Sequence, residues 1–383
     1  MSHAEIIMLS MLAILIAAFY GRLISRITKG WTELEKAPGD IHPEVKISVL
    51  VPFRNEKENI IMLMEALRQQ DYPVELFEVI LINDHSNDGG DEAARLVGNT
   101  SSIQCLDLPE GMSGKKRALQ LGIDHAGGQL IVTTDADCRP GKGWLSSIAS
   151  YYSRWQFKMI AGPVAIADPK GFMSKFQALE FTSLVASGAG AIKSVMPIMC
   201  NGANLAYEKS AFEEVGGFRG NEHIAGGDDI FLLEKFKKKF GSRQIGFAKD
   251  RQAIVYTDAA KDLKHFLNQR FRWVSKSPAY RDPAMILTAV LVLLVNLGLL
   301  TTLVWGFWSP EMLMVFGVMF LLKCLIDLPI LWNATGFFDQ RKLMAWYLPF
   351  QFIYFIFVSL VGILGNIIPY RWKNKGPQRS ADL

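Results

Sequence analysis

Hydrophobic residues are distributed unevenly along this chain, in long runs near both ends and in short runs between them. Residues 284–308 and 343–368 are each long and apolar enough to cross a bilayer as a helix, which takes about 20 apolar residues. A shorter run, 6–20, extends toward Ile24 and is predicted to form an N-terminal membrane anchor. The pattern therefore predicts one N-terminal transmembrane helix and two to three C-terminal ones.

The uncertain span is the apolar segment 312–332, which contains two charged residues. Lys323 and Asp327 are four residues apart and would share one face of a helix. This spacing is compatible with an ion pair inside a membrane span, and equally with a re-entrant or interfacial segment. The sequence leaves both interpretations open.

Positive charge indicates the orientation of the first run. Arg22, Arg26 and Lys29 follow it, whereas a cleaved signal peptide has its positive charge before the apolar stretch. Basic residues flank membrane spans on the cytoplasmic side. The following domain is therefore predicted to be cytoplasmic, although three C-terminal spans would leave the basic tail, 371–383, on the opposite side.

Short β-branched segments alternate with helical patterns in the middle of the chain. Strands are predicted at 47–51, 77–82, 103–106 and 130–134, and helices at 57–70, 91–97 and 115–124. Such alternation is typical of an α/β domain with a mostly parallel sheet. The predicted organisation is an anchor at 1–30, an α/β catalytic domain at 44–282, transmembrane helices at 283–370 and the basic tail at 371–383.

Composition excludes several functional classes. The net charge of +4 is small for 383 residues and argues against a nucleic-acid binder. The four cysteines form no CxxC pair and have no metal-ligand spacing with the six histidines, so we expect reduced thiols and no zinc site. The first strand lacks a following GxGxxG, and no complete P-loop motif is present.

Two carboxylates follow the predicted strand 130–134. Asp135 and Asp137 are separated by one small residue, and carboxylates so close repel each other unless a cation or hydrogen bonds offset the charge. Mg²⁺ or Mn²⁺ fits this arrangement, because hard cations of this kind take one or two carboxylates together with water and phosphate oxygens.

A series of short motifs, three of them at strand ends, has the order seen in one known family. In chain order they are Val51-Pro52-Phe53-Arg54-Asn55-Glu56, Asn83-Asp84-His85-Ser86-Asn87-Asp88-Gly89, Gly114-Lys115, Thr134-Asp135-Ala136-Asp137, the loop around Gly202, Gly227-Asp228-Asp229 and Gln269-Arg270-Phe271-Arg272-Trp273. Together they resemble the membrane-bound branch of glycosyltransferase family 2, whose catalytic domain has the GT-A fold. Asn83, His85 and Asp228 depart from the family's usual residues.

The resemblance implies roles for individual residues. The predicted nucleotide-sugar contacts are Pro52, Asn55, Glu56, Asp84, Lys115, Asp135 and Arg272. The predicted metal ligands are Asp135 and Asp137, and the predicted acceptor contacts are Gly202, Gln269 and Trp273. Because the acceptor hydroxyl must lose a proton to a carboxylate during attack, Asp229 is predicted to be the catalytic base.

The predicted activity is metal-dependent, inverting transfer of a hexosyl or N-acetylhexosaminyl group. The expected donor is a nucleotide sugar, with a UDP-sugar favoured, and the expected acceptor is a polysaccharide or a lipid-linked molecule. Similar motifs occur in cellulose, hyaluronan and poly-N-acetylglucosamine synthases. Two alternatives stay open: a single-transfer lipid glycosyltransferase, and a catalytically silent membrane scaffold. Residues 263–274, which contain the last motif, also fit an amphipathic helix in the membrane interface.

Overall fold

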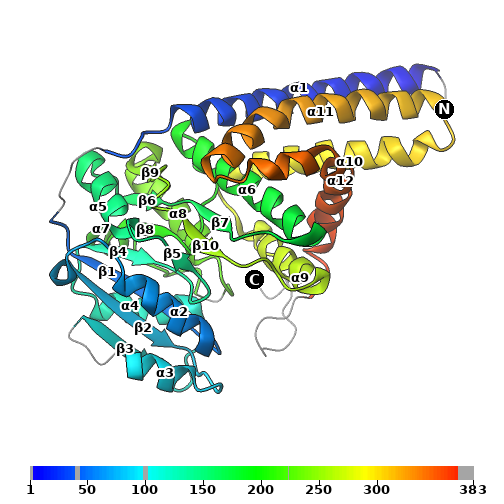
Figure 1. The fold of residues 1–383 in the computed structure, drawn as a ribbon. Helices are drawn as coiled ribbons and strands as arrows, with labels where there is room; N and C mark the ends of the chain where they lie inside the picture. Colours follow the sequence, from blue (N-terminus) through cyan, green and yellow to red (C-terminus); the bar gives the residue numbers. More distant parts are fainter. Residues whose placement is uncertain (1–2, 39–43, 98–101, 223, 370–383) are drawn as a thin grey trace. The chain divides into compact units, whose positions relative to one another are not determined.

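The computed structural model describes residues 3–38, 44–97, 102–222 and 224–369, in two compact units (Figure 1). The first, here called the helical unit, comprises Met1–Thr32, Pro169–Ser194 and Ala260–Leu383. The second, the sheet unit, comprises Glu33–Asp168 and Val195–Ala259. The predicted basic tail, 371–383, lies outside the described residues.

A seven-stranded sheet forms the centre of the sheet unit (Figure 1). Four strands at one side run parallel, and β8 is antiparallel to both of its neighbours. This confirms the predicted α/β class with a mostly parallel sheet. In spatial order the strands are β3 (Ile103–Asp107), β2 (Phe77–Asn83), β1 (Ile47–Phe53), β4 (Leu130–Thr133), β8 (Leu205–Glu208), β6 (Met159–Ala161) and β9 (Ile245–Phe247).

The central strands are fully buried because their β-branched and aliphatic residues are covered on both faces, as is usual for parallel sheets. Helix α4 approaches the sheet closely: a Cβ on Gly122 would lie 3.0 Å from Ile82 and 3.2 Å from Leu50. The other helices of this unit are α2 (Lys57–Arg68), α3 (Gly90–Val97), α5 (Trp144–Trp155), α7 (Lys209–Glu214) and α8 (Asp228–Phe240), and α4 is Lys115–His125. A small second sheet contains β5 (Arg139–Pro140), β10 (Val255–Thr257) and β7 (Val164–Ile166).

Four helices of the helical unit are long and apolar enough to cross a membrane. They carry many exposed large apolar side chains, such as Leu287 and Met314, which suit contact with lipid. Helix α1 continues beyond the predicted run 6–20, and its candidate span is Met11–Glu33. The helices are α1 (His3–Glu33), α10 (Pro283–Gly306), α11 (Pro310–Phe337) and α12 (Tyr347–Leu364), the last preceded by a short 3₁₀ helix, η4 (Arg341–Trp346).

The segment 312–332 lies within one continuous helix, α11, although Pro329 is inside it. Lys323 and Asp327 form the ion pair that their spacing suggested, with 2.6 Å between Lys323 Nζ and Asp327 Oδ2. Tyr20 of α1 donates to the other oxygen of Asp327 at 2.7 Å, and Lys323 also donates to Gln351 of α12 at 3.0 Å. This buried network connects three of the apolar helices.

Two further helices belong to the helical unit by their contacts, although the sequence placed them inside the catalytic domain 44–282. They are α6 (Gly171–Lys193) and α9 (Leu263–Val274). Helix α6 meets α1 at two glycines: a Cβ on Gly30 would lie 2.1 Å from the carbonyl oxygen of Gly190. Helix α9 has the same range as the amphipathic helix predicted at 263–274.

Candidate active site

The loops that follow β1 and β2 are joined by hydrogen bonds. The two strands pair in parallel up to Phe53 and Asn83, so their following residues emerge at the same edge of the sheet. The amide of Asn55 donates to Ser86 Oγ at 3.0 Å, and the amide of Asn87 donates to Asn55 Oδ1 at 2.8 Å. Asn55 has a φ of 53°, which Asn tolerates better than most residues. The segment predicted to bind the nucleotide sugar, from Pro52 to Glu56, is therefore held by hydrogen bonds against the loop that follows β2.

Asp84 lies beneath this edge and is almost fully buried. One of its oxygens, Oδ2, accepts the amide N–H of Gly114 at 3.0 Å, just before α4 begins. The other oxygen lies 3.8 Å from the guanidinium of Arg54 and accepts no hydrogen bond from the described residues. Asp84 is thus a buried carboxylate that is fixed by the Gly114 amide and lies next to the Arg54 guanidinium.

Lys115 joins two carboxylates that are far apart in the sequence. Its Nζ lies 2.7 Å from Asp135 Oδ1, after β4, and 3.2 Å from Asp228 Oδ2, at the start of α8. Burial by itself would lower the pKa of this ammonium, but the charges of Asp135 and Asp228 outweigh burial and raise its pKa. Lys115 therefore stays charged, and with Asp135, Asp228 and Asp229 it forms what we call the lysine–aspartate cluster.

Gly202 packs against the lysine–aspartate cluster. Its carbonyl accepts from the hydroxyl of Thr133 at 2.8 Å, and its amide donates to Asp229 Oδ2 at 3.1 Å. A Cβ at this position would lie 2.9 Å from Asp228 Oδ2 and 3.2 Å from Lys115 Nζ. The loop predicted to face the acceptor thus lies directly against the predicted base.

Asp229 is partly exposed and lies in the first turn of α8, after the left-handed Gly227. Burial and the neighbouring charge of Asp228 raise the pKa of its carboxyl, while Lys115 and the amides of Ile230 and Gly202 oppose the increase. The net effect raises the pKa of Asp229. A carboxylate with a raised pKa is a stronger base than an ordinary aspartate, which is the property that proton removal requires.

The donors available for a metal ion are Asp135 and Asp137. Asp137 is exposed, and Asp135 is partly exposed and paired with Lys115. Among the residues that the structure describes, no group of three or more His, Cys, Asp or Glu side chains converges on one point. Asp135 and Asp137 stay the predicted metal ligands, and a hard cation such as Mg²⁺ or Mn²⁺ would take one or two carboxylates and complete its shell with phosphate and water.

The last predicted motif lies in the helical unit, on α9. Gln269, Arg272 and Trp273 are all partly exposed. Between them in the sequence, Arg270 is buried and forms a two-pronged ion pair with Glu180 of α6. These three predicted residues are assembled by the helical unit, whereas all the other predicted site residues belong to the sheet unit.

Comparison with models of known protein families assigns this chain to one of them. The model of glycosyl transferase family 21 matches residues 9–375, which is nearly the whole chain. The chain belongs to glycosyl transferase family 21. The resemblance to family 2 correctly indicated a glycosyltransferase with a GT-A fold, and the family match assigns it to family 21.

Individual relatives agree with this assignment. The chain is 28% identical to glycosyltransferase AglE of Haloferax volcanii over 226 residues, which cover 59% of this chain and 71% of AglE. It is 35% identical to dolichyl-phosphate beta-glucosyltransferase ALG5D of Trichomonas vaginalis over 105 residues, covering 25% and 31% of the two chains. Mannosyltransferase PcManGT of Pyrobaculum calidifontis, solved with GDP-Man and Mn²⁺, superposes with a TM-score of 0.58 at 19% identity, covering 94% of this chain and 98% of PcManGT. The last similarity confirms the fold.

Two residues of this family 21 chain, Lys116 and Asn204, support the loops of the candidate site but were not selected from the sequence. Lys116, next to Lys115, is buried and donates to the carbonyls of Asn221 at 2.6 Å and Ile224 at 3.1 Å, in the loop before Asp228. Asn204 receives the indole N–H of Trp144 at 2.9 Å beneath the Gly202 loop. A buried lysine that lies next to a motif lysine carries no distinguishing local signal, because its partners are far away in the sequence.

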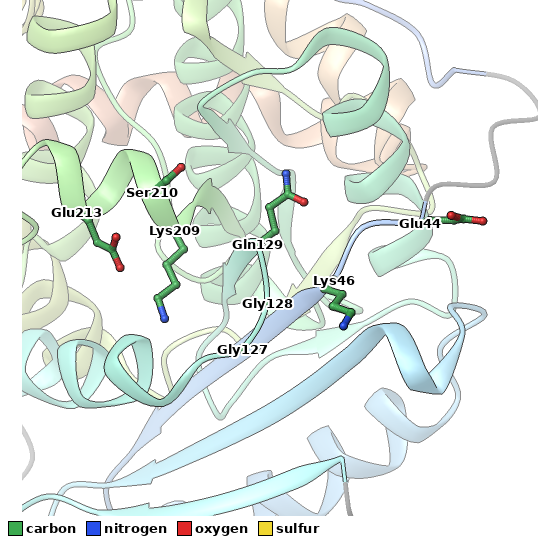
Figure 2. Close-up of a pocket in the computed structure, with 8 residues that line it drawn as sticks. All are labelled: Glu44, Lys46, Gly127, Gly128, Gln129, Lys209, Ser210 and Glu213. Atoms are coloured by element: carbon green, nitrogen blue, oxygen red, sulfur yellow. The ribbon is translucent and has the colours of Figure 1, made fainter.

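A separate hollow of about 530 Å³ occurs in the sheet unit (Figure 2). Lys46 precedes β1 and Gln129 precedes β4, so the hollow lies at the amino ends of these strands, whereas the candidate site follows their carboxyl ends. Ligands of open α/β sheets bind at the carboxyl ends. The hollow is therefore not part of the candidate site. Its lining residues are Glu44, Lys46, Gly127, Gly128, Gln129, Lys209, Ser210 and Glu213.

Proposed function

We propose that this glycosyltransferase moves a sugar from a nucleotide sugar to a lipid or lipid-linked acceptor at the membrane, with inversion of the anomeric centre. The observation that carries the proposal is the lysine–aspartate cluster with Gly202 against it. This arrangement brings together the charged ammonium of Lys115, the Asp229 carboxylate with its raised pKa and Gly202, which has no side chain. A site that had lost catalysis would have no need of such an arrangement.

The donor is assigned to the edge formed by the loops after β1 and β2. Asp84 lies at this edge with the Arg54 guanidinium 3.8 Å from its Oδ1, so the edge has a buried carboxylate and a cation side by side. We favour a UDP-sugar as the donor. Lys115 supplies positive charge for the diphosphate.

Asp135 and Asp137 would hold Mg²⁺ or Mn²⁺ at the diphosphate. The ion would supply neutralisation of the charge that develops on the departing nucleoside diphosphate. Asp229 takes the proton of the acceptor hydroxyl, and the Gly202 amide holds Asp229 Oδ2 in a fixed direction. One direct displacement of this kind inverts the anomeric configuration.

The acceptor is assigned from the helical unit and the relatives. The four apolar helices would hold the enzyme in the bilayer, where a lipid acceptor is located. ALG5D is named for a dolichyl-phosphate acceptor, which is lipid-linked. Lys323, Asp327 and Phe355 are buried inside the helical unit, so this part of its interior is filled by side chains. These observations favour a single transfer over processive polysaccharide synthesis, for which product length is the test.

The function is tested by measuring nucleoside diphosphate release from purified protein in mixed micelles. The assay supplies a panel of nucleotide sugars, Mg²⁺ or Mn²⁺, and farnesyl phosphate with a total membrane lipid extract as acceptors. Asp229→Asn should lower turnover by about 10²-fold or more while donor binding is retained, and Asp137→Ala should remove the response to the metal. The control is Asp124→Asn, an exposed aspartate on α4. Release by no donor would support the scaffold alternative, and a ladder of products would support the processive one.

A further inference from the structure

Arg270 is not among the residues selected from the motif Gln269-Arg270-Phe271-Arg272-Trp273, yet it is the most buried residue of the five. We propose that Arg270, fixed by Glu180, is a positioning residue that holds Gln269 and Trp273 in the orientation needed to receive the acceptor. The inference rests on the proposed function in one respect, the contact of the α9 face with the acceptor. The inference itself is that Arg270, without contacting a ligand, orients the α9 face that carries Gln269 and Trp273.

The ion pair is held in a single geometry. Arg270 Nε donates to Glu180 Oε1 at 2.9 Å, and Arg270 Nη2 donates to Glu180 Oε2 at 2.5 Å. Both side chains are about 5% exposed, so solvent screens the pair little. Two parallel hydrogen bonds between a guanidinium and a carboxylate fix direction as well as distance. Glu180 lies on α6, so the pair fastens α9 to a second helix.

The same guanidinium contacts both residues that it is proposed to position. Its central carbon lies 4.0 Å from the ring centroid of Trp273 and 4.6 Å from that of Phe266. Its third nitrogen, Nη1, donates to Gln269 Oε1 at 2.5 Å. The oxygen of the Gln269 amide is therefore directed inward, and its NH₂ group is the part that can donate to a ligand. Moving Arg270 would release both side chains at once.

The surrounding aromatic residues make this part of α9 rigid. Phe266 packs edge-on against Phe176 of α6 at 6.1 Å and stacks on Phe357 of α12 at 5.2 Å. Trp273 also lies 6.3 Å from Phe181 of α6. The face that carries Gln269 and Trp273 is thus anchored on two helices, and Arg270 is its polar centre.

Packing alone does not account for a charged pair at this position. Burying two ions carries a desolvation penalty, and apolar residues of similar size often replace such a pair without loss of stability. Arginine differs from both apolar residues and lysine because its planar fork can bond Glu180 and Gln269 while its face stacks on Trp273. The geometry uses all of these properties together.

The test separates positioning from stability with a double variant. Glu180→Met together with Arg270→Met removes both charges and leaves no unpaired ion, so we expect a folded protein. Its KM for farnesyl phosphate or extracted lipid should rise about tenfold, the equivalent of one charge-assisted hydrogen bond. Its KM for the donor should stay within about twofold of the original protein. A matched control removes the ion pair of the sheet unit, with Lys158→Met and Glu208→Met, and should leave the acceptor KM unchanged.

A coupling measurement completes the test. In a Trp273→Ala background, the same double variant should raise the acceptor KM by a smaller factor than in the original protein, because only Gln269 is then left to be positioned. Arg270→Lys should behave like the loss of Arg270, since lysine keeps the charge without the planar fork. An unchanged acceptor KM in the double variant, or full additivity with Trp273→Ala, would overturn the inference. If the original protein turns over no donor with these acceptors, the proposed function fails, and with it the acceptor role of Arg270.

Discussion

Lys115 and Asp228 form an ion pair at 3.2 Å that joins the start of α4 to the start of α8. The same ammonium binds Asp135 at 2.7 Å, so one lysine separates two carboxylates that would otherwise repel each other. This contact turns three separate motifs into one site.

Replacing Lys115 is expected to disable the donor site. Lys115→Met leaves Asp135 and Asp228 without their shared cation and removes the positive charge assigned to the diphosphate. Turnover should fall by about 10²- to 10³-fold, as expected when one preorganised electrostatic contact to the reacting groups is lost, and the donor KM should rise. Arg117→Met provides the control, because Arg117 is an exposed cation on the same helix. Near-normal turnover by Lys115→Met would rule out this role.

Lys116 predicts a pH-dependent stability. Burial lowers the pKa of its ammonium to about 8, although the charges of Asp228, Asp229 and Glu222 oppose the decrease and Lys235 adds to it. In the unfolded chain the lysine keeps its ordinary pKa of about 10.4. The unfolded state therefore binds more protons between these values, and stability rises with pH in this window.

The measurement is the melting temperature in detergent, compared with Lys116→Met. Below pH 8 the original protein carries the full cost of the buried charge, about 3 kcal/mol from the shift in pKa. As the pH rises from 8 toward 10, its melting temperature should increase relative to the variant, which has no group that titrates there. A constant difference across this range would show that Lys116 has an ordinary pKa.

The network around Asp327 should dominate the stability of the helical unit. Lys323→Met leaves the buried Asp327 carboxylate with the Tyr20 hydroxyl as its hydrogen-bond partner among the described residues and should destabilise the protein by about 3–5 kcal/mol. Tyr20→Phe removes one hydrogen bond and should cost about 1–3 kcal/mol. Thermal unfolding in detergent measures both, with the exposed Lys342→Met as control. Equal melting temperatures for Lys323→Met and Lys342→Met would contradict this assignment.

The directions of the apolar helices predict the membrane topology. Tyr20 contacts Asp327 and Trp31 contacts Phe337, so α1 and α11 run parallel, and α10 runs antiparallel to α11 because Gly306 lies against Leu313 and Gly298 against Met319. The cations Arg26, Lys29, Arg281, Arg341 and Lys342 then flank one end of α1, α10 and α11, while the connection 307–309 between α10 and α11 has no charge. The positive-inside rule assigns the charged end, and hence the connected sheet unit, to the cytoplasm.

Labelling of introduced cysteines tests this orientation. In intact cells, a membrane-impermeant maleimide should modify Ser309→Cys. Lys342→Cys should react only after the membrane is opened. The reverse pattern would place the sheet unit outside the cell and would contradict the expected supply of cytoplasmic nucleotide sugar.

The sequence by itself determined the features that depend on local pattern. Each predicted strand of the first four agrees with the structure within about two residues, because a β-branched run such as 47–51 has few alternatives to a buried strand. The four apolar runs coincide with the four candidate spans, because length and hydropathy reveal such segments, but the sequence left open whether 312–332 crosses the membrane. The order of the short motifs, through its resemblance to known glycosyltransferases, identified Asp84, Lys115, Asp135 and Asp229 as candidates.

Only the tertiary structure decided how these residues act on one another. The bond between Lys115 and Asp228, the approach of Gly202 to both, and the pairing of Arg270 with Glu180 join segments that are distant in the chain. Whether α11 is one continuous helix was likewise settled by the partners that Lys323 and Asp327 find on α12 and α1. Local preference cannot specify such contacts, because the cost of burying a charge depends on which partner the folded chain brings to it.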